Sequence, residues 1–129
     1  MGHQIIAGDI MAKSIFIICS VRGTEDDYRQ RLEAYVSKLE QGGSKVHLPH
    51  RDTDQSAPGI EICRQNQGAI LKADEVHVFY NSKSQGTHFD MGVAFALNKE
   101  IIVVENEEYG PGKSYPRMLI EWQGRKPLV

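Results

Sequence analysis

The segment that most constrains the fold is residues 73–104, ADEVHVFYNSKSQGTHFDMGVAFALNKEIIVV. It contains two short apolar runs, residues 75–80 and 100–104, which are separated by a polar loop and by a stretch rich in small residues. Short apolar runs of this kind are typical of strands that are buried on both faces of a sheet. The small residues in the intervening stretch, residues 88–97, let a helix pack closely on that sheet. The segment therefore predicts two parallel strands joined by a helix.

The rest of the chain continues this alternation of strands and helices. The predicted strands are residues 14–19, 45–48, 75–80 and 100–104. The predicted helices are residues 28–39, ended by Gly42 and Gly43, and residues 60–71, 88–97 and 116–122. The apolar stripe expected on the second of these helices is Ile60, Cys63, Ile70 and Leu71. Residues 49–59, rich in Asp, Ser and Pro, predict a polar and mobile loop near the ligand.

This order of elements predicts the fold class. Strands that alternate with helices along a chain usually form a parallel sheet with right-handed crossovers. We therefore expect a small doubly wound α/β domain, flavodoxin-like or Rossmann-like, with helices on both faces of the sheet.

The length of 129 residues suits one domain. We expect that domain to span residues 13–129, because the strand pattern begins only after a second methionine, Met11, and residues 1–12 to be a tag or a disordered arm. No apolar run approaches the roughly 20 residues of a membrane span, and the amino terminus lacks a secretory pattern. We therefore expect a cytoplasmic protein with no membrane partner.

Charge and potential metal ligands narrow the class of partner. The net charge of −2 and the pI near 6.2 give no basic field for nucleic acid, so a small molecule is the expected partner. Cys19 and Cys63 have neither the spacing of a metal site nor that of a disulfide framework. Four residues in or shortly after the second predicted strand superficially resemble metal ligands, but their spacing fits no common signature. These residues are His47, His50, Asp52 and Asp54. We expect no metal and no other cofactor.

Two polar loops are predicted to meet at one edge of the sheet. SVRGT, residues 20–24, follows the first strand, and NSKSQGT, residues 81–87, follows the third. Ligands of doubly wound folds bind beyond the carboxyl ends of the strands, and a loop that opens a helix offers N–H groups to an anion. Arg22 adds a planar donor group suited to phosphate, and Gly23 lets backbone N–H groups come close. The alternative is that Arg22 pairs only with a neighbouring surface acid and that residues 81–87 form an ordinary turn.

Asp90 follows the second loop by about one helical turn. In that position a carboxylate faces a molecule bound at the loop. The alternative is an acid in the first turn of a helix, which the helix dipole favours without any function.

Three stretches together resemble the nucleoside 2-deoxyribosyltransferase superfamily, most nearly its 2'-deoxynucleoside 5'-monophosphate N-hydrolase branch. They are IFIICSVRGTEDDYRQRL, NQGAILKADEVHVF and SKSQGTHFDMGVAFALNKEIIVV. The resemblance covers roughly residues 15–104, and its specific parts are the SVRG loop and the stretch S-x-G-x-x-x-[acid]-x-G. It implies cleavage of an N-glycosidic bond by a flavodoxin-like domain that forms a homodimer or a larger homo-oligomer.

Residue by residue, the resemblance assigns the two polar loops to the substrate. Ser20, Arg22 and Gly23 match the family loop that binds the 5'-phosphate. Ser84 and Gly86 match a second segment that contacts the phosphate. With the neighbouring hydroxyl of the same loop, the expected phosphate- and substrate-binding residues are Ser20, Arg22, Gly23, Ser84, Gly86 and Thr87.

Three further positions match the family's chemistry but depart from its usual residues. Asp90 occupies the position of the catalytic glutamate that attacks the anomeric carbon. Asn66 falls where an aspartate normally assists at the base or sugar, and Phe16 stands where many members have a tyrosine that contacts substrate. An aspartate carboxylate is withdrawn by about 1.5 Å relative to glutamate, and a misplacement near 1 Å costs on the order of a hundredfold in rate unless the backbone compensates. Asn66 cannot act as a general acid, so Asp52 or Asp54 is a candidate replacement.

The expected function is hydrolysis of the N-glycosidic bond of a (deoxy)nucleoside 5'-monophosphate, with Asp90 and Asn66 as the catalytic pair. This function requires the Arg22 guanidinium and the Asp90 carboxylate to open into one pocket. Two alternatives remain at this point. One is a nucleotide-binding or sensing module whose chemistry is disabled by the three departures. The other is deoxyribosyl transfer between bases, although plain nucleosides have no phosphate for the SVRG loop to bind.

Overall fold

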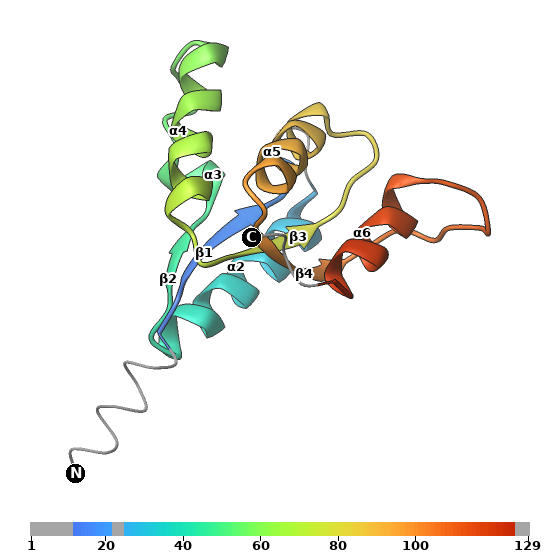
Figure 1. Cartoon of the computed structure of the whole chain (residues 1–129). Coiled ribbons are helices and arrows are strands. Elements are labelled where there is room, and N and C mark those ends of the chain that lie inside the picture. Colours follow the sequence, from blue (N-terminus) through green and yellow to red (C-terminus); the bar gives the residue numbers. More distant parts are fainter. Residues whose placement is uncertain (1–11, 22–24, 126–129) are drawn as a thin grey trace.

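In the computed structural model, residues 12–21 and 25–125 are described (Figure 1). Within these ranges, four strands form one sheet: β1 (Ser14–Ile18), β2 (Lys45–His47), β3 (Glu75–Phe79) and β4 (Glu100–Glu105). The helices of the described ranges are α2 (Asp26–Gln41), α3 (Pro49–Asp52), α4 (Gly59–Lys72), α5 (Gln85–Ala96) and α6 (Tyr115–Gln123). The sheet order is β2-β1-β3-β4, and each neighbouring pair is parallel.

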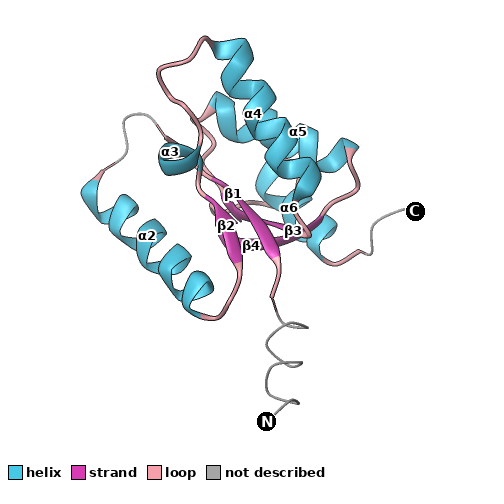
Figure 2. Cartoon of the chain, turned by 90° about the vertical axis from the view of Figure 1, so that its left-hand side faces the viewer, coloured by secondary structure: helices cyan, strands magenta, loops and turns pink. Residues whose placement is uncertain are grey.

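Helices cover both faces of this sheet (Figure 2). Because successive side chains of a strand point to opposite faces, β1 contributes to two separate cores. Ile15 and Ile17 pack in one core with Leu32 of α2. Phe16 and Ile18 pack in the other, which α4, α5 and α6 supply. The predicted doubly wound α/β fold is therefore confirmed, with β1 and β3 as its buried central strands.

The predicted loop over residues 49–59 is wrong in its first part, where α3 forms. Pro49 stands in the first turn of α3, where its fixed φ angle suits a helix and its missing N–H group costs no hydrogen bond. Asp52 accepts a hydrogen bond from the backbone N–H of Leu48 at 2.9 Å and so ties the end of this short helix to its beginning. The segment after β2 is therefore held in place by its own polar contacts.

The predicted apolar stripe of α4 is also partly wrong. Ile60 is 66% exposed and Leu71 is 59% exposed, whereas Asn66 and Ile70 are buried. Ile60 lies in the first turn of α4, and Figure 1 shows that this end of the helix extends beyond the sheet. Asn66 takes a buried place because its amide finds hydrogen-bond partners there, which offsets the cost of removing a polar group from water.

Helix α5 begins at Gln85, three residues before the predicted start at residue 88. Ser84 is its N-cap, and the Ser84 hydroxyl accepts a hydrogen bond from the backbone N–H of Thr87 at 3.1 Å. This cap joins the polar loop of residues 81–87 directly to the start of α5. None of the helices in the described ranges is long and apolar enough to cross a membrane.

Candidate active site

Asp90 lies in the second turn of α5 and is only 5% exposed. Burial raises the pKa of Asp90 to about 7, and a hydrogen bond from Asn66 partly offsets this rise. The nearby Cys19 thiol, just after β1, is buried as well. Burial and, second, the negative charge of Asp90 raise the pKa of Cys19 to about 12, so the thiol stays neutral. Near neutral pH, Asp90 is therefore close to the midpoint between a carboxylic acid and a carboxylate.

Asn66 is brought against Asp90, as the sequence predicts for a catalytic pair. The Asn66 Nδ2 group donates to Asp90 Oδ2 at 3.4 Å, a long hydrogen bond between α4 and α5. On its other side, Asn66 Oδ1 accepts from the Thr53 hydroxyl at 2.6 Å. Both Asn66 and Thr53 are less than one-tenth exposed. Asn66 thus links the candidate nucleophile to the segment that follows α3.

His47 and Thr53 join this cluster, although the sequence singles out His47 only for its resemblance to a metal ligand and Thr53 not at all. His47 Nε2 lies 2.7 Å from Thr53 Oγ1, at the end of β2. Phe16 has no exposed surface and stacks on the His47 ring, with centroids 5.3 Å apart and planes 15° apart. In this structure, Phe16 therefore supports His47 from behind and lines no open surface. No sequence signal marks Thr53, because its importance comes only from contacts with residues distant in the chain.

The loop before α5 places the candidate phosphate-binding residues Ser84, Gly86 and Thr87 at the amino end of that helix. His88 holds this loop, since its Nδ1–H donates to the Ser84 carbonyl at 2.7 Å and its Nε2 lies 2.9 Å from the Tyr80 hydroxyl. Thr87 is fully buried, and its hydroxyl has no hydrogen-bond partner among the described residues. The helix terminus, with its unpaired N–H groups, favours an anion at this loop.

The other polar loop begins at the same edge of the sheet. Ser20 is buried two residues after the end of β1, and its backbone N–H donates to the Tyr28 hydroxyl at 3.1 Å. Strands β1 and β3 are parallel neighbours, so both loops leave the sheet at the carboxyl ends of adjacent strands. Arg22 and Gly23 lie outside the described residues, and a common pocket for Arg22 and Asp90 therefore stays a prediction.

Three of the four residues that superficially resemble metal ligands make structural contacts, whereas the buried Nε2 of His50 has no hydrogen-bond partner among the described residues. Asp52 pairs with Arg51 at 2.8 Å, and Asp54 accepts from the backbone and the hydroxyl of Ser56. Neither carboxylate forms a hydrogen bond with Asn66 or Asp90, so a role for Asp52 or Asp54 as the replacement acid stays a prediction. Across residues 12–21 and 25–125, no three His, Cys, Asp or Glu side chains are placed to hold a metal ion together.

Two enzymes of solved structure share this fold. The CMP N-glycosidase BcmB from Clostridium botulinum is 20% identical, with a TM-score of 0.61, and the alignment covers 87% of this chain and 81% of that chain. The 2-deoxyribosyltransferase from Bacillus psychrosaccharolyticus is 13% identical, with a TM-score of 0.63, over 89% of this chain and 98% of that chain. At these identities the similarity establishes the fold.

A conserved protein from Enterococcus faecalis V583 has the same fold, with 17% identity, a TM-score of 0.58, and coverage of 82% of this chain and 71% of that chain. No curated protein matches the sequence. Residues 15–122, however, match the family described as nucleoside 2-deoxyribosyltransferase, and this match includes every element from β1 to α6. The chain therefore belongs to the nucleoside 2-deoxyribosyltransferase family.

Proposed function

We propose that this protein hydrolyses the N-glycosidic bond of a (deoxy)nucleoside 5'-monophosphate. The observation that carries the proposal is the buried Asp90 carboxyl, which lies one turn beyond the helix N-terminus formed by Ser84 and its neighbours. Cleavage of a nucleotide by this mechanism needs two things: the phosphate of the substrate at the helix N-terminus, and the anomeric carbon of its sugar beside Asp90. The similarity in fold to a CMP N-glycosidase supports the same reaction class.

In the proposed reaction, the bond between the anomeric carbon and the base nitrogen breaks, and its electron pair leaves with the base. The Asp90 carboxylate faces the positive charge that develops on the sugar and captures or stabilises it. Water then adds its oxygen to the anomeric carbon, and where Asp90 has bonded to that carbon, this bond breaks and its electron pair returns to the carboxylate. The proton that water loses balances the one that the base takes up. Asn66 has no acidic proton to give, so it serves as a hydrogen-bond donor only.

A screen of substrates tests this proposal. The protein is incubated with ribo- and deoxyribonucleoside 5'-monophosphates and with the matching nucleosides, and free base is measured by chromatography. We expect base release from at least one monophosphate, with the matching nucleoside at least about tenfold slower because it lacks the charged anchor. Release of no base from any member of the panel would contradict the proposal. A second base added as acceptor separates hydrolysis from transfer, since transfer would yield a new nucleoside.

Nucleotide sensing without turnover is the second candidate. Two features favour sensing. Asn66 is not an acid, and the Asp90 side chain is shorter than that of glutamate and is half protonated near neutral pH. In this case, calorimetry shows tight binding of a monophosphate with no released base. The Arg22→Ala variant then loses affinity, because the guanidinium is the proposed phosphate ligand.

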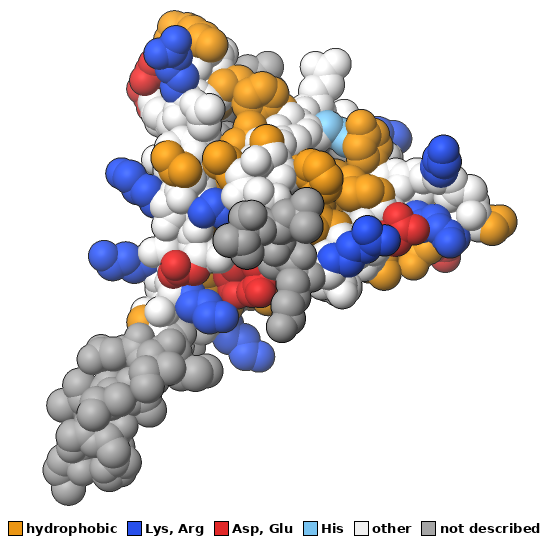
Figure 3. Space-filling model, viewed as in Figure 1, with side chains coloured by type: hydrophobic (Ala, Val, Ile, Leu, Met, Phe, Trp, Pro, Cys, Tyr) orange, Lys and Arg blue, Asp and Glu red, His pale blue; other side chains and the backbone are white. Residues whose placement is uncertain are grey.

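We also propose that the protein assembles as a homodimer or a larger homo-oligomer through the outer face of α5. Phe89 of α5 and Leu97, just after it, are 49% and 36% exposed, and Phe95, on another side of the helix beside Trp122 of α6, is 62% exposed. Figure 3 shows hydrophobic side chains gathered over α5 and toward α6. Exposed apolar side chains gathered in this way usually mark an interface.

Light scattering coupled to size-exclusion chromatography is expected to give a mass of at least two chains, against 14.5 kDa for one. The Phe89→Asp variant is expected to shift the population to single chains, because it places a charge in the apolar face. The Glu108→Gln variant, at an exposed loop position, is the control and should leave the mass unchanged. A wild-type protein that elutes as a single chain at all concentrations would remove this proposal.

A further inference from the structure

We propose that Thr53 and His47 are positioning residues that hold the Asn66 amide with its NH2 group toward Asp90. The four side chains form one hydrogen-bond series from the end of β2 to α5. The orientation of the amide is a property of the free protein. Its consequence for hydrolysis rests on the proposed function.

The series consists of two short hydrogen bonds and one long one. His47 Nε2 to Thr53 Oγ1 is 2.7 Å, Thr53 Oγ1 to Asn66 Oδ1 is 2.6 Å, and Asn66 Nδ2 to Asp90 Oδ2 is 3.4 Å. Thr53, Asn66 and Asp90 are 4%, 7% and 5% exposed, so water competes little for these bonds. In such surroundings, the direction of each hydrogen bond matters energetically.

The number of hydrogen-bond donors on each side chain fixes the direction of every hydrogen bond in the series. A threonine hydroxyl carries one proton, and an amide oxygen only accepts. Because Thr53 donates to Asn66 Oδ1, its oxygen must accept from His47, which therefore carries a proton on Nε2. The Asn66 NH2 group is then the side that faces Asp90. One choice of histidine tautomer thus propagates through two side chains to the carboxylate.

The reverse orientation of the amide would suit a protonated Asp90 only. With Asn66 turned over, its Oδ1 would face Asp90 Oδ2, and two acceptors at 3.4 Å repel when Asp90 is ionised. The Asn66 NH2 group would then donate to Thr53, and Thr53 would donate to His47 Nε2. His47 would carry its proton on Nδ1. The reverse direction of the series thus requires a protonated Asp90, whereas a proton on His47 Nε2 gives the direction that an ionised Asp90 needs.

The surroundings of His47 keep its ring neutral, so that the ring carries its single proton on either Nε2 or Nδ1. Burial lowers the pKa of His47, so near neutral pH the ring is neutral and carries a single proton. Asp52 raises this pKa, and Arg51 lowers it; these two charges lie next to each other and pair at 2.8 Å. At the other end of the series, the titratable neighbour of Asp90 is the buried, neutral thiol of Cys19, which directly follows β1.

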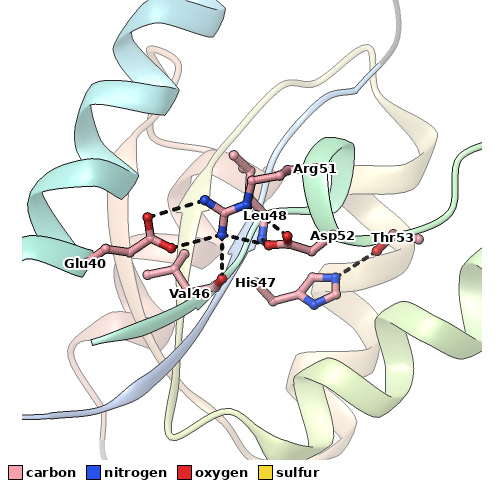
Figure 4. A network of polar contacts seen from close by, with 7 residues as sticks. All are labelled: Glu40, Val46, His47, Leu48, Arg51, Asp52 and Thr53. Carbon is pink, nitrogen blue, oxygen red and sulfur yellow. Dashed lines mark hydrogen bonds and ion pairs between the residues drawn. The ribbon is translucent and has the colours of Figure 1, made fainter. Parts of the chain in front are cut away.

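Arg51 holds the segment that carries Thr53 (Figure 4). Its guanidinium donates to Glu40 of α2 at 3.0 Å and to the carbonyl of Val46 in β2 at 2.9 Å. It also donates to Asp52 at 2.8 Å, directly before Thr53. Helix α2, strand β2 and helix α3 are thereby joined around one planar side chain, which keeps His47 and Thr53 within hydrogen-bond distance.

Nitrogen-15 NMR of histidine-labelled protein at pH 8.5 tests the proposal without any substrate. In the wild type, we expect the chemical shifts of His47 to report the tautomer protonated on Nε2. Thr53→Val removes the hydroxyl and is expected to give a mixture of both tautomers, whereas Thr53→Ser keeps the hydroxyl and the wild-type tautomer. The wild-type shifts alone decide the orientation if Thr53→Val does not fold, and a proton on Nδ1 in the wild type would overturn the proposal.

Two further readouts use the same variants. Carbon-13 titration of the Asp90 carboxyl is expected to show a midpoint about half a pH unit higher in Thr53→Val, because the amide no longer holds its NH2 group against the carboxylate. A midpoint that does not differ between Thr53→Val and the wild type would contradict the positioning role. For hydrolysis, we expect kcat of Thr53→Val to fall about tenfold with KM unchanged, and Thr53→Ser to restore it. If both NMR results are as expected but no substrate is cleaved, the proposed function fails and the positioning of Asn66 stands.

Discussion

Replacing Asp90 by asparagine is expected to lower the rate of base release by on the order of a thousandfold or more. The amide has nearly the same shape as the carboxyl, so the packing around α5 stays the same. It carries no negative charge, however, and neither bonds to nor stabilises a positively charged sugar carbon. The rate is measured by chromatography of free base, on the monophosphate that the wild type cleaves fastest. A variant that retains more than about a tenth of wild-type activity would show that Asp90 is not the nucleophile or stabiliser.

Two control variants sharpen this result. Asp90→Glu restores the family's usual residue and extends the carboxylate by about 1.5 Å, so it is expected to keep far more activity than Asp90→Asn. Glu108→Gln removes one negative charge at an exposed position of the loop after β4 and is expected to leave the rate unchanged. If Glu108→Gln lost as much activity as Asp90→Asn, the loss would reflect net charge and not the chemistry of the site.

The sheet could be predicted from the sequence because β1, β3 and β4 are short, mainly apolar runs between polar residues. All four strands end within one residue of their predicted limits. Helix boundaries were less accurate where side chains make local hydrogen bonds. Ser84 starts α5 three residues early through its cap, and the contacts of Asp52 turn part of a predicted loop into α3. Such hydrogen bonds depend on the local backbone geometry of a few residues and leave no periodic pattern of apolar residues in the sequence.

The candidate site was predicted only where a residue lies in a recognisable segment. Asp90 follows the loop at the start of α5, and Asn66 was placed by its distance from the next strand, so both could be named in advance. His47 and Thr53 could not, since their role depends on the fold bringing the ends of β2 and α3 against the middle of α4. Asn66 also breaks the apolar pattern of its helix, and a buried polar residue of this kind is the sequence signal that points to a network.

The substitution Asp90→Asn is also expected to stabilise the folded protein at high pH. The pKa of Asp90 is about 7 in the folded protein against 3.8 for an unperturbed aspartate. Between these two values the folded chain holds a proton that the unfolded chain has lost, so the stability of the wild type falls as the pH rises through this window. A rise of about three units at about 1.4 kcal/mol each corresponds to about 4 kcal/mol of lost stability above pH 7. The neutral amide avoids this loss, because no buried charge forms.

Urea unfolding at pH 4 and pH 8 measures this effect. We expect the free energy of unfolding of Asp90→Asn to equal that of the wild type at pH 4 and to exceed it by about 4 kcal/mol at pH 8. Glu108→Gln should show no such difference between the two pH values. Equal stabilities of Asp90→Asn and the wild type at pH 8 would mean that the carboxylate is well solvated in the folded protein. A large gain would instead show that the buried carboxylate destabilises the fold, as is common where a charged group is retained for its chemistry.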